Sequence, residues 1–319
     1  MEPHAQPRAS NLVVSLYQAF FIIALVGVLS GFVNSYWWVF EVLSSFRVQY
    51  ALILGLGAVL AFHQRRPRLV MLALMAFAAN GCWLFPYVVS SESGSGHSSS
   101  LKVSTLNVHT ANTRWDLVLG FIASRSPDIA FFTEVNEEWV SRLKPLEKIY
   151  PFSISKPRAD NFGVALYSKI PPQRLEIHEF LSGELPSVLM TFLKGSETIT
   201  LVGTHPLPPR TPAYSACRNS QIDTIAAFFS RIPRKKILIG DLNTAPWADL
   251  FQNLLRVGGL RDTALGRGIQ VTWPKHAWWL LGVPIDHCLI SPDLTVISRS
   301  IDPEVGSDHY PIFVELGIP

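Results

Sequence analysis

Residues 236–243 read Lys-Ile-Leu-Ile-Gly-Asp-Leu-Asn, and this stretch decides the fold. An apolar run of strand length is followed directly by an acid and an amide, Asp241 and Asn243. Alternate residues at a strand end point the same way, so the two side chains can act on one phosphate and its water. Residues 306–311, Gly-Ser-Asp-His-Tyr-Pro, echo the pattern with a second acid at a strand edge. The pattern indicates metal-assisted phosphoester hydrolysis.

Further polar residues follow other strand-like runs along the chain. Each lies at the end of, or inside, a short β-branched and aliphatic stretch. These residues are Asn107, Glu134, His205, Asp286, Asp308 and His309. Polar groups at the ends of several strands, with helices between the strands, form a cleft at one rim of a sheet. We therefore expect one polar cleft.

The catalytic part is expected in residues 101–319, where strand-like runs outnumber helical patterns. The helical patterns fall at residues 114–124, 137–143, 215–229 and 249–257. The strand spacing is hairpin-like in the middle, with strand-helix-strand units at both ends. This organisation favours an α/β fold, a four-layer sandwich of two packed mixed β-sheets flanked by helices.

The first 89 residues hold the most apolar runs of the chain. Residues 12–33 and 69–89 are uncharged over 22 and 21 residues. At about 1.5 Å per residue each run spans roughly 30 Å, the thickness of a bilayer core. Residues 48–62 reach only roughly 22 Å, so we expect this span to extend toward Leu43, with Arg47 snorkelling to the interface. The prediction for residues 1–89 is a membrane anchor of three transmembrane helices, because the first run is longer than a signal-peptide core.

Basic residues predict the orientation of these spans. Arg65, Arg66 and Arg68 lie in the connection 63–68, whereas the connection 34–47 carries only Arg47. Short cytoplasmic loops are enriched in Lys and Arg, so the connection 63–68 is expected in the cytoplasm. With three spans, residues 101–319 then lie on the extracytoplasmic side of an inner or plasma membrane. Loss of the second span would reverse this inference.

The serine-rich stretch and the three cysteines give little further information about the fold or the location of the protein. Residues 90–100, Ser-Ser-Glu-Ser-Gly-Ser-Gly-His-Ser-Ser-Ser, have the composition of a flexible linker. Cys82 lies in the third predicted span, which leaves Cys217 and Cys288 in the soluble part. Sequence spacing does not decide whether those two pair.

Six motifs in order make the chain resemble the endonuclease/exonuclease/phosphatase family, a metal-dependent superfamily that includes deoxyribonucleases and neutral sphingomyelinases. They are Leu-Asn-Val at 106–108, Phe-Thr-Glu at 132–134, Gly-Thr-His-Pro at 203–206, Gly-Asp-Leu-Asn at 240–243, Ile-Asp-His at 285–287 and Gly-Ser-Asp-His-Tyr-Pro at 306–311. One motif alone is weak. Six in the family's order, over residues 101–316, are specific.

The resemblance implies a metal site. Glu134 would be the main Mg²⁺ ligand, and Mn²⁺ could take its place. Asn107 and Asp308 would complete or orient the metal shell, often through water, as Mg²⁺ prefers.

The resemblance also implies the catalytic roles. Asp241 would orient or deprotonate the attacking water, and Asn243 would hold a phosphate oxygen. His309, oriented by Asp286, would bind the phosphate and stabilise charge in the transition state. His205 would contact the phosphate from the other side or protonate the leaving oxygen.

Each residue alone has a plainer interpretation. Asn107 could form a turn and Glu134 could be a solvated loop acid, while Asp241 and Asn243 could cap a helix that begins near Pro246. The order of the motifs outweighs these interpretations.

The other histidines are not covered by the motif order. We expect His109, His178 and His276 at the surface or in packing. His287 alternates in direction with Asp286 along its strand and should face away from the cleft.

Composition gives little support for a particular substrate. Residues 101–319 carry 22 Lys and Arg against 21 Asp and Glu, a net charge of +1. A duplex-binding nuclease usually presents a strongly basic face. A local basic patch could exist at residues 231–236, but it precedes the strand that leads to Asp241 and is expected at the opposite rim. The chain also lacks the tryptophan and the Asp-Arg pair that inositol-polyphosphate phosphatases carry around the motif at 284–287.

A tryptophan-rich loop runs from Trp273 to Val283, before Asp286, and includes Trp278 and Trp279. It could pack in the core. Alternatively, it could form a lip near the cleft that touches lipid or stacks on a base.

The sequence thus predicts a membrane-anchored, Mg²⁺-dependent phosphodiester or phosphoester hydrolase that directs water at phosphorus. A surface endonuclease acting on DNA or RNA and a sphingomyelinase-like lipid phosphodiesterase stay open as alternatives. A non-catalytic binding protein would need a damaged site, yet no expected catalytic position is missing. The expected partners are a phosphoester substrate, either nucleic acid or a phospholipid head group, and the bilayer. The natural substrate and the oligomeric state are not decided.

Overall fold

The structure, a computed structural model, describes residues 8–89, 99–181, 185–233, 235–274 and 281–319. It divides into two compact units, Met1–Pro86 and Tyr87–Pro319. The first holds the helices of the expected anchor, and the second holds all the strands.

The first unit is helical. It contains α1 (Arg8–Ser30), α2 (Trp38–Ser44), α3 (Arg47–His63) and most of α4 (Pro67–Val88). Within the described residues, α4 alone is long and apolar enough to cross a membrane, and α2 with α3 would make a second span only as a pair bent by 60°. The part of α1 with described side chains, Tyr17–Ser30, is a shorter apolar helix. The prediction of three transmembrane helices is therefore not supported, because the helix bends between Ser44 and Arg47 instead of running straight on toward Leu43.

Arg47 does not snorkel to an interface as expected. It is fully buried, and its guanidinium donates from Nη2 to the carbonyl of Gly31 (2.9 Å) and from Nη1 to Oδ1 of Asn80 (3.2 Å). Asn80 in turn donates to the carbonyl of Arg47 (2.7 Å), and the guanidinium lies 5.0 Å from the ring centroid of Trp83. Gly31 is required here, since a Cβ would lie 2.4 Å from Nη2. Neighbouring helices satisfy the charge, so it does not need to reach water.

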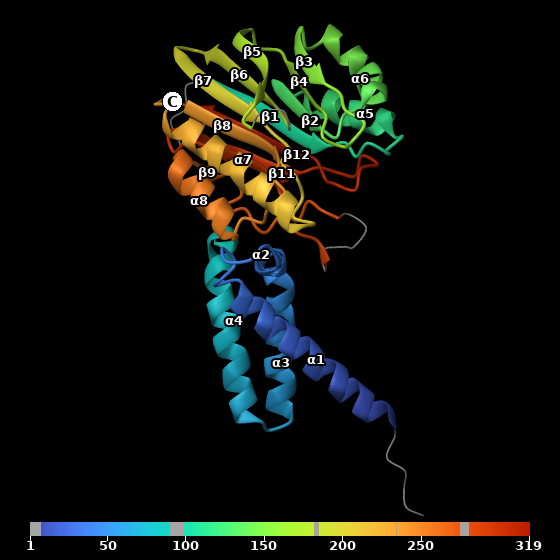
Figure 1. The fold of residues 1–319 in the computed structure, drawn as a ribbon, viewed down its shortest axis with the longest axis vertical. Helices are drawn as coiled ribbons and strands as arrows, with labels where there is room; N and C mark the ends of the chain where they lie inside the picture. Colours follow the sequence, from blue (N-terminus) through green and yellow to red (C-terminus); the bar gives the residue numbers. More distant parts are fainter. Residues whose placement is uncertain (1–7, 90–98, 182–184, 234, 275–280) are drawn as a thin grey trace, which may run out of the picture. The chain divides into compact units, whose positions relative to one another are not determined.

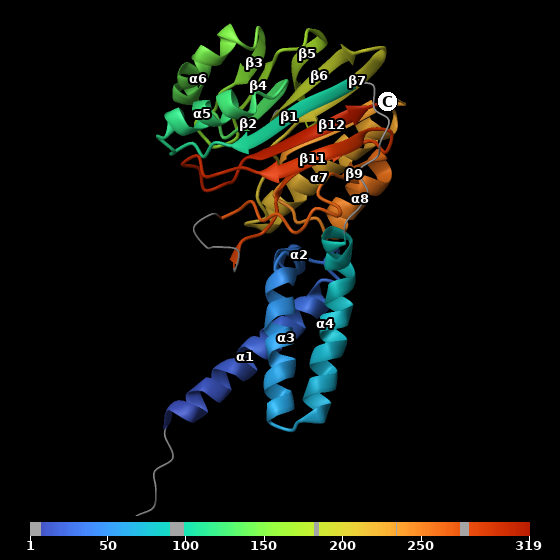
Figure 2. The same ribbon diagram turned by 180° about the vertical axis from the view of Figure 1, so that it is seen from behind.

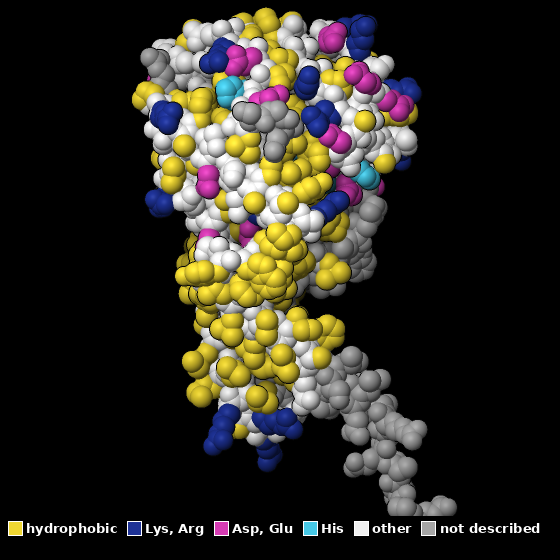
Figure 3. Space-filling view, viewed as in Figure 1, with side chains coloured by type: hydrophobic (Ala, Val, Ile, Leu, Met, Phe, Trp, Pro, Cys, Tyr) yellow, Lys and Arg dark blue, Asp and Glu magenta, His cyan; other side chains and the backbone are white. Residues whose placement is uncertain are grey.

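The surface of this unit is apolar. Phe62, Met75 and Phe85 expose 70%, 63% and 65% of their surface, and Figure 3 shows hydrophobic side chains spread over the helices. The turn between α3 and α4 is different, because Arg65, Arg66 and Arg68 are all exposed there.

The second unit is built from two packed mixed sheets (Figure 1). The first sheet has the order β11-β12-β1-β2-β4-β3 and the second β5-β6-β7-β8-β10-β9. The strands of the first sheet are β1 (Ser99–Asn107), β2 (Ile129–Thr133), β3 (Phe152–Lys156), β4 (Val164–Ser168), β11 (Thr295–Ile301) and β12 (Ile312–Ile318). Those of the second are β5 (Pro172–Glu179), β6 (Pro186–Lys194), β7 (Glu197–Gly203), β8 (Lys235–Asp241), β9 (Arg261–Asp262) and β10 (Asp286–Ile290). In each sheet one neighbouring pair is parallel, β1 with β2 and β7 with β8.

Alternation along the strands builds the layers. Ile237 and Ile239 of β8 lie in the core between the sheets, and Leu238 packs under the helices on the other face. The helices α5 (Trp115–Arg125) and α6 (Glu137–Leu143), followed by the 3₁₀ turn η1 (Lys144–Lys148), cover the first sheet. The helices α7 (Pro212–Ser230) and α8 (Asp249–Gly258) cover the second (Figures 1 and 2). The four-layer sandwich predicted from the sequence is confirmed.

The structure changes the predicted end of the linker and describes the state of the two cysteines. Ser99 and Ser100, placed in the linker, begin β1 and pair with Ile318 and Gly317 of β12. The rest of the linker, residues 90–98, lies outside the described residues. Cys217 and Cys288 are both free thiols.

In the basic stretch at residues 231–236, Arg231 is exposed, whereas both lysines have partners within the fold. Lys235 pairs with Glu197 (2.8 Å), and Nζ of Lys236 donates to the carbonyls of Phe229 (2.9 Å) and Gly258 (3.0 Å) at the ends of α7 and α8. Both lysines therefore serve the fold. Residue 234 lies outside the described residues.

Candidate active site

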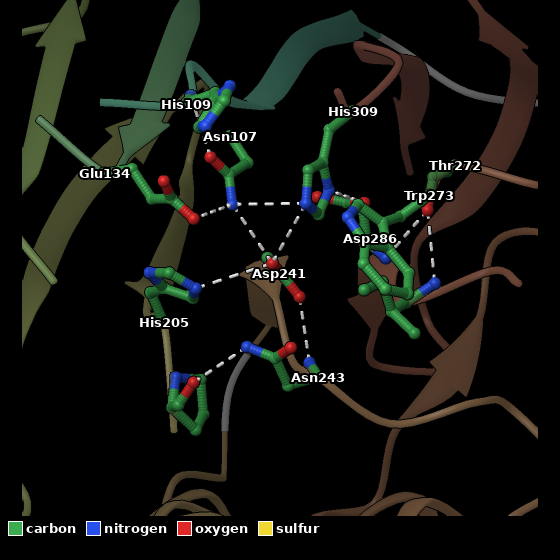
Figure 4. Close-up of polar contacts among 12 residues, drawn as sticks. Asn107, His109, Glu134, His205, Asp241, Asn243, Thr272, Trp273, Asp286 and His309 are labelled. Carbon is green, nitrogen blue, oxygen red and sulfur yellow. Dashed lines mark hydrogen bonds and ion pairs between the residues drawn. The ribbon is translucent and has the colours of Figure 1, made fainter. Parts of the chain in front are cut away.

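The predicted site residues meet because strands from both sheets end at one rim. Asn107 is the last residue of β1, and Glu134 directly follows β2, its parallel neighbour. In the second sheet Asp241 ends β8, and His205 follows β7. Asp286 begins β10, which is antiparallel to β8, and pairs in register with Asp241. Figure 4 shows these side chains converging.

Asp241 is the centre of the network. Its Oδ2 accepts a hydrogen bond from Nδ2 of Asn107 (3.2 Å) and lies 3.4 Å from Nε2 of His205 and 3.7 Å from Nε2 of His309. The same Asn107 amide donates to Oε1 of Glu134 (2.9 Å). Asp241 and both histidines are buried, whereas Glu134 is partly exposed to the cleft. The carboxylate of Asp241 therefore lies between two imidazoles.

The turn after β8 has a constrained backbone. Gly240 has φ +138°, and a Cβ there would lie 2.0 Å from the carbonyl of Thr204. Asn243 has φ 51°, a left-handed conformation, and its backbone N–H donates to Oδ1 of Asp241 (2.9 Å). Its side-chain amide donates to the carbonyl of Pro206 (2.9 Å). Glu134 is also left-handed, with φ 61°. Such conformations need support from their surroundings and often mark functional sites.

His309 is held in a fixed orientation. Its Nδ1 lies 2.8 Å from Oδ2 of Asp286, which is 1% exposed, so Nε2 faces Asp241 and the cleft. The backbone N–H of His309 donates to Oγ of Ser307 (3.0 Å), and that hydroxyl donates to the carbonyl of Asn107 (2.7 Å). This contact holds His309 from behind, which is consistent with the orienting role that the family resemblance implies for Asp286.

The carboxylate of Asp241 and the imidazoles of His205 and His309 shift each other's pKa values, because the carboxylate and each imidazole favour the charged form of the other. Burial opposes ionisation of Asp241, but the hydrogen bond from His205 and the charges of His309 and His205 lower its pKa to about 2. Burial also opposes protonation of His309, but the neighbouring Asp286 raises its pKa to about 10. The pKa of His205 is raised in the same way, by Asp241 against the effect of burial. Near neutral pH Asp241 is therefore an ionised carboxylate beside a protonated His309, and His205, whose pKa is raised, lies on its other side.

These side chains line an open cleft of about 280 Å³. Six of the predicted residues contribute to its wall, namely Glu134, His205, Asp241, Asn243, Asp308 and His309. Residues outside the prediction complete it, including Asp160, Phe162, Arg210 and Tyr214. Asn107 and Asp286 lie behind this wall and hold it in place.

Two of the lining residues outside the predicted set contact Asp308. His109, expected at the surface or in packing, lies in the cleft with Nδ1 3.7 Å from Oδ1 of Asp308. The only available signal was its place two residues after Asn107, whose Oδ1 accepts the backbone N–H of His109 (3.0 Å). Trp273 donates from Nε1 to Oδ2 of Asp308 (3.1 Å). Sequence spacing alone carried no signal for that contact.

Two further predictions concern the tryptophan-rich loop and His287. Trp273 pairs with Val283 at the base of the tryptophan-rich loop, but Trp278, Trp279 and His276 lie outside the described residues, so the lip is untested. His287 faces away from the cleft, as expected, with its ring centroid 4.6 Å from that of Phe251.

Two groups of side chains could hold a cation. Asp241, Asp286 and His309 offer one ligand atom each, all within 4.8 Å of one another. Nδ1 of His309 and Oδ2 of Asp286 form a hydrogen bond with each other, so we regard this group as an orienting pair beside a carboxylate. Glu134 and Asp308 provide oxygen donors in the cleft, and Oδ1 of Asp308 is buried without a hydrogen-bond partner among the described residues. This oxygen set fits a hard divalent cation such as Mg²⁺.

A four-layer sandwich with acids, amides and histidines at one end of both sheets defines a class of phosphoester-processing proteins. Residues 105–309 match the model of the Endonuclease/Exonuclease/phosphatase family, and the chain belongs to this family. Its members are typically metal-dependent hydrolases of phosphoesters. No curated protein sequence gives a significant match.

Solved structures share the fold. A humanised D. rerio TDP2 with 14 mutations is 20% identical, with a TM-score of 0.58, over 69% of this chain and 100% of that one. D. rerio TDP2 complexed with a single-strand DNA product is 18% identical, with a TM-score of 0.57, over 69% and 99%. An endonuclease/exonuclease/phosphatase from Bacteroides vulgatus is 17% identical, with a TM-score of 0.58, over 69% and 100%. At these identities the likeness extends to the fold alone.

Proposed function

We propose that this protein is a membrane-anchored, Mg²⁺-dependent phosphodiesterase. One observation carries the proposal: a buried, ionised carboxylate, Asp241, lies between His205 and His309 in an open cleft. This arrangement offers an acceptor for a water proton and cationic donors for phosphate oxygens within one small volume.

Glu134 and Asp308 would hold the cation, with Asn107 orienting Glu134 through its hydrogen bond. When bound, Mg²⁺ would supply positive charge to the phosphate oxygens. Trp273 and His109 flank Asp308 and would fix the direction of its carboxylate.

The residues of the chain account for the remaining steps. Asp241 would orient the attacking water and receive its proton as the water oxygen bonds to phosphorus. His309 and the Asn243 amide would donate to the non-bridging oxygens, where charge accumulates. The ester P–O bond then breaks, and the imidazolium of His205 would protonate the leaving oxygen. Asp286 keeps His309 directed at the phosphate.

We propose nucleic acid, with single-stranded ends favoured, as the substrate class. Phe162, Tyr214 and Trp273 line the cleft together with Arg210, and aromatic faces with a cation suit unpaired bases and their backbone. The DNA product in the D. rerio TDP2 structure is consistent with this choice. The pairing of Lys235 and Lys236 within the fold argues against a wide basic surface for duplex DNA.

The apolar surface of the helical unit supports the proposed membrane anchoring. Exposed side chains such as Phe62, Met75 and Phe85 would be unfavourable in water and suit lipid. The chain from the basic turn at Arg65–Arg68 to the catalytic unit passes through α4. If α4 spans the bilayer, the turn and the catalytic unit lie on opposite sides of it. The orientation then does not depend on the second predicted span, contrary to the expectation from the sequence. If the turn is cytoplasmic, the catalytic unit is extracytoplasmic.

The activity is tested with the full chain purified in detergent with Mg²⁺. We expect hydrolysis of bis-p-nitrophenyl phosphate and of single-stranded DNA, with kcat about 1,000-fold lower in Asp241→Asn. Asp128→Asn is the matched control, because Asp128 precedes β2 at the opposite end of the first sheet. Absence of hydrolysis by the wild type on both substrates would refute the proposal. Hydrolysis of sphingomyelin in place of DNA would reassign the substrate class.

The orientation is tested separately. Alkaline phosphatase or a fluorescent protein that matures only in the cytosol is fused after Pro319 of the full chain. We expect phosphatase activity without fluorescence, and the reverse would place the catalytic unit in the cytoplasm.

A further inference from the structure

We propose that Arg218 and Gln221 of α7 are positioning residues that hold Asn243 and His205 in register with each other. The inference rests on the proposed function, since it assigns both held residues to phosphate binding. It concerns residues outside the cleft wall, on the helix behind it.

Both residues lie on the buried face of α7, which is apolar from Ile222 onward. Arg218 is 0% exposed and Gln221 1%, although the neighbouring buried residues are Ile222, Ile225 and Phe229. Burying a guanidinium or an amide costs free energy unless hydrogen bonds compensate. At positions that only pack a helix on a sheet, apolar side chains would be the more stable choice.

Arg218 holds the backbone of Asn243. Its Nη1 donates to the carbonyl of Asn243 (2.8 Å), while Nε and Nη2 donate to Oδ1 of Asn219 at 3.1 and 2.9 Å, which fixes the guanidinium plane. The backbone N–H of Asn243 is held from the other side by Asp241. Both backbone polar groups of this left-handed residue are therefore bound, and its side chain projects in a fixed direction.

Gln221 holds the residue before His205. Its Nε2 lies 3.1 Å from Oγ1 of Thr204, and that hydroxyl also bonds to Oγ of Ser187 (2.8 Å). The backbone N–H of Thr204 donates to the carbonyl of Ile239 (3.0 Å). The start of the His205 loop is therefore tied to α7 and to β8.

The contact of Arg218 with Asn243 and the contact of Gln221 with Thr204 are structurally connected. Arg218 and Gln221 are three residues apart, so they lie on the same face of the helix, one turn from each other. The amide of Asn243 donates to the carbonyl of Pro206 and closes the connection between the two loops. One turn of α7 thus sets the spacing between the donors of Asn243 and His205, and a misplacement of about 1 Å can cost roughly 100-fold in rate.

The test uses the full chain in detergent with bis-p-nitrophenyl phosphate and Mg²⁺. Arg218→Met should lower kcat by about 10- to 100-fold with a smaller change in KM, and Arg218→Lys should recover part of it. Gln221→Leu should lower kcat by about 10-fold. Ile225→Ala is the matched control, because this residue is fully buried one turn further along α7. It should lower the melting temperature and leave kcat unchanged.

A double-mutant cycle separates positioning from general stability. In an Asn243→Ala background the effect of Arg218→Met on kcat should shrink at least several-fold, since the group that Arg218 positions has been removed. An equal fold-change in both backgrounds would overturn the inference, as would an unchanged kcat with only a lower melting temperature. A wild type that hydrolyses the substrate, with an inactive Asp241→Asn, keeps the proposed function intact in either of these outcomes.

Discussion

The two units bury polar groups in different ways. In the helical unit Arg47 is fully buried, and its guanidinium contacts the carbonyl of Gly31, the amide of Asn80 and the ring of Trp83. In the catalytic unit Asp241 is almost as buried, but its partners His205 and His309 line an open cleft of about 280 Å³. One polar group is enclosed by protein, and the other faces a space that a substrate can enter.

The difference separates packing from chemistry. The guanidinium of Arg47 donates to a backbone oxygen and an amide oxygen, and these hydrogen bonds stabilise one arrangement of the helices. A buried charge surrounded by other ionised groups at a cleft gains affinity for an incoming ligand of matching charge. Removing the charge of Arg47 should lower the stability of the helical unit, and removing the charge of Asp241 should lower the catalytic activity.

The largest effect is expected for Asp241→Asn. The side chain keeps its size but loses the charge that orients the water and favours the protonated forms of His205 and His309. We expect kcat to fall by about 1,000-fold with little change in the melting temperature. Steady-state rates and thermal unfolding of the full chain measure both. A kcat within tenfold of the wild type would remove Asp241 from the chemistry.

Arg47→Met tests whether the buried charge of the helical unit contributes to stability and not to activity. The methionine loses both hydrogen bonds of the guanidinium, and we expect the helical unit to lose about 3 kcal/mol of stability while kcat per folded molecule is unchanged. Unfolding in mixed micelles, followed by circular dichroism, gives the stability. Met75→Ala, at an exposed position, is the control and should change it by less than about 0.5 kcal/mol. Loss of kcat in Arg47→Met would contradict the separation of roles.

Glu134→Gln should act through the cation. A neutral amide keeps an oxygen donor but loses the negative charge, so about tenfold more Mg²⁺ should be needed for half-maximal rate, with recovery at high Mg²⁺. Glu137→Gln, three residues further on and exposed, should leave the titration unchanged. Coinciding titration curves for Glu134→Gln and the wild type would exclude this carboxylate as the principal ligand.

The smallest effect concerns His287, which is buried like His205 but away from the cleft. Burial lowers the pKa of His287 below its ordinary value, so the unfolded chain binds a proton that the folded one does not. Its contribution to stability is present above about pH 6.5 and is lost as the pH falls below that value. The free energy of unfolding should therefore fall less between pH 7.5 and pH 5.5 in His287→Gln than in the wild type, which denaturant unfolding at the two pH values measures. Equal differences would show that His287 does not contribute to acid sensitivity.

The sequence by itself determined the sandwich and most of the site. The apolar runs mark the strands through a period of two, and Asn107, Glu134 and Asp241 stand where those runs end. Strand ends in adjacent parallel strands meet at one edge, so these positions predict a cleft from local patterns alone. The alternation of Asp286 and His287 likewise predicted that His287 would face away from the cleft.

Tertiary structure alone decided the contacts that join distant segments. Trp273 reaches Asp308 across 35 positions of the chain, and Arg218 reaches Asn243 across 25, although neither contact has a periodic signal. Apolar runs in the first unit also predicted a surface position for Arg47, yet Gly31 leaves room for its guanidinium and Asn80 satisfies it. Periodicity describes which side of a helix or strand is buried. Which partner a buried polar group finds depends on how separate elements pack, and that information lies in the folded molecule.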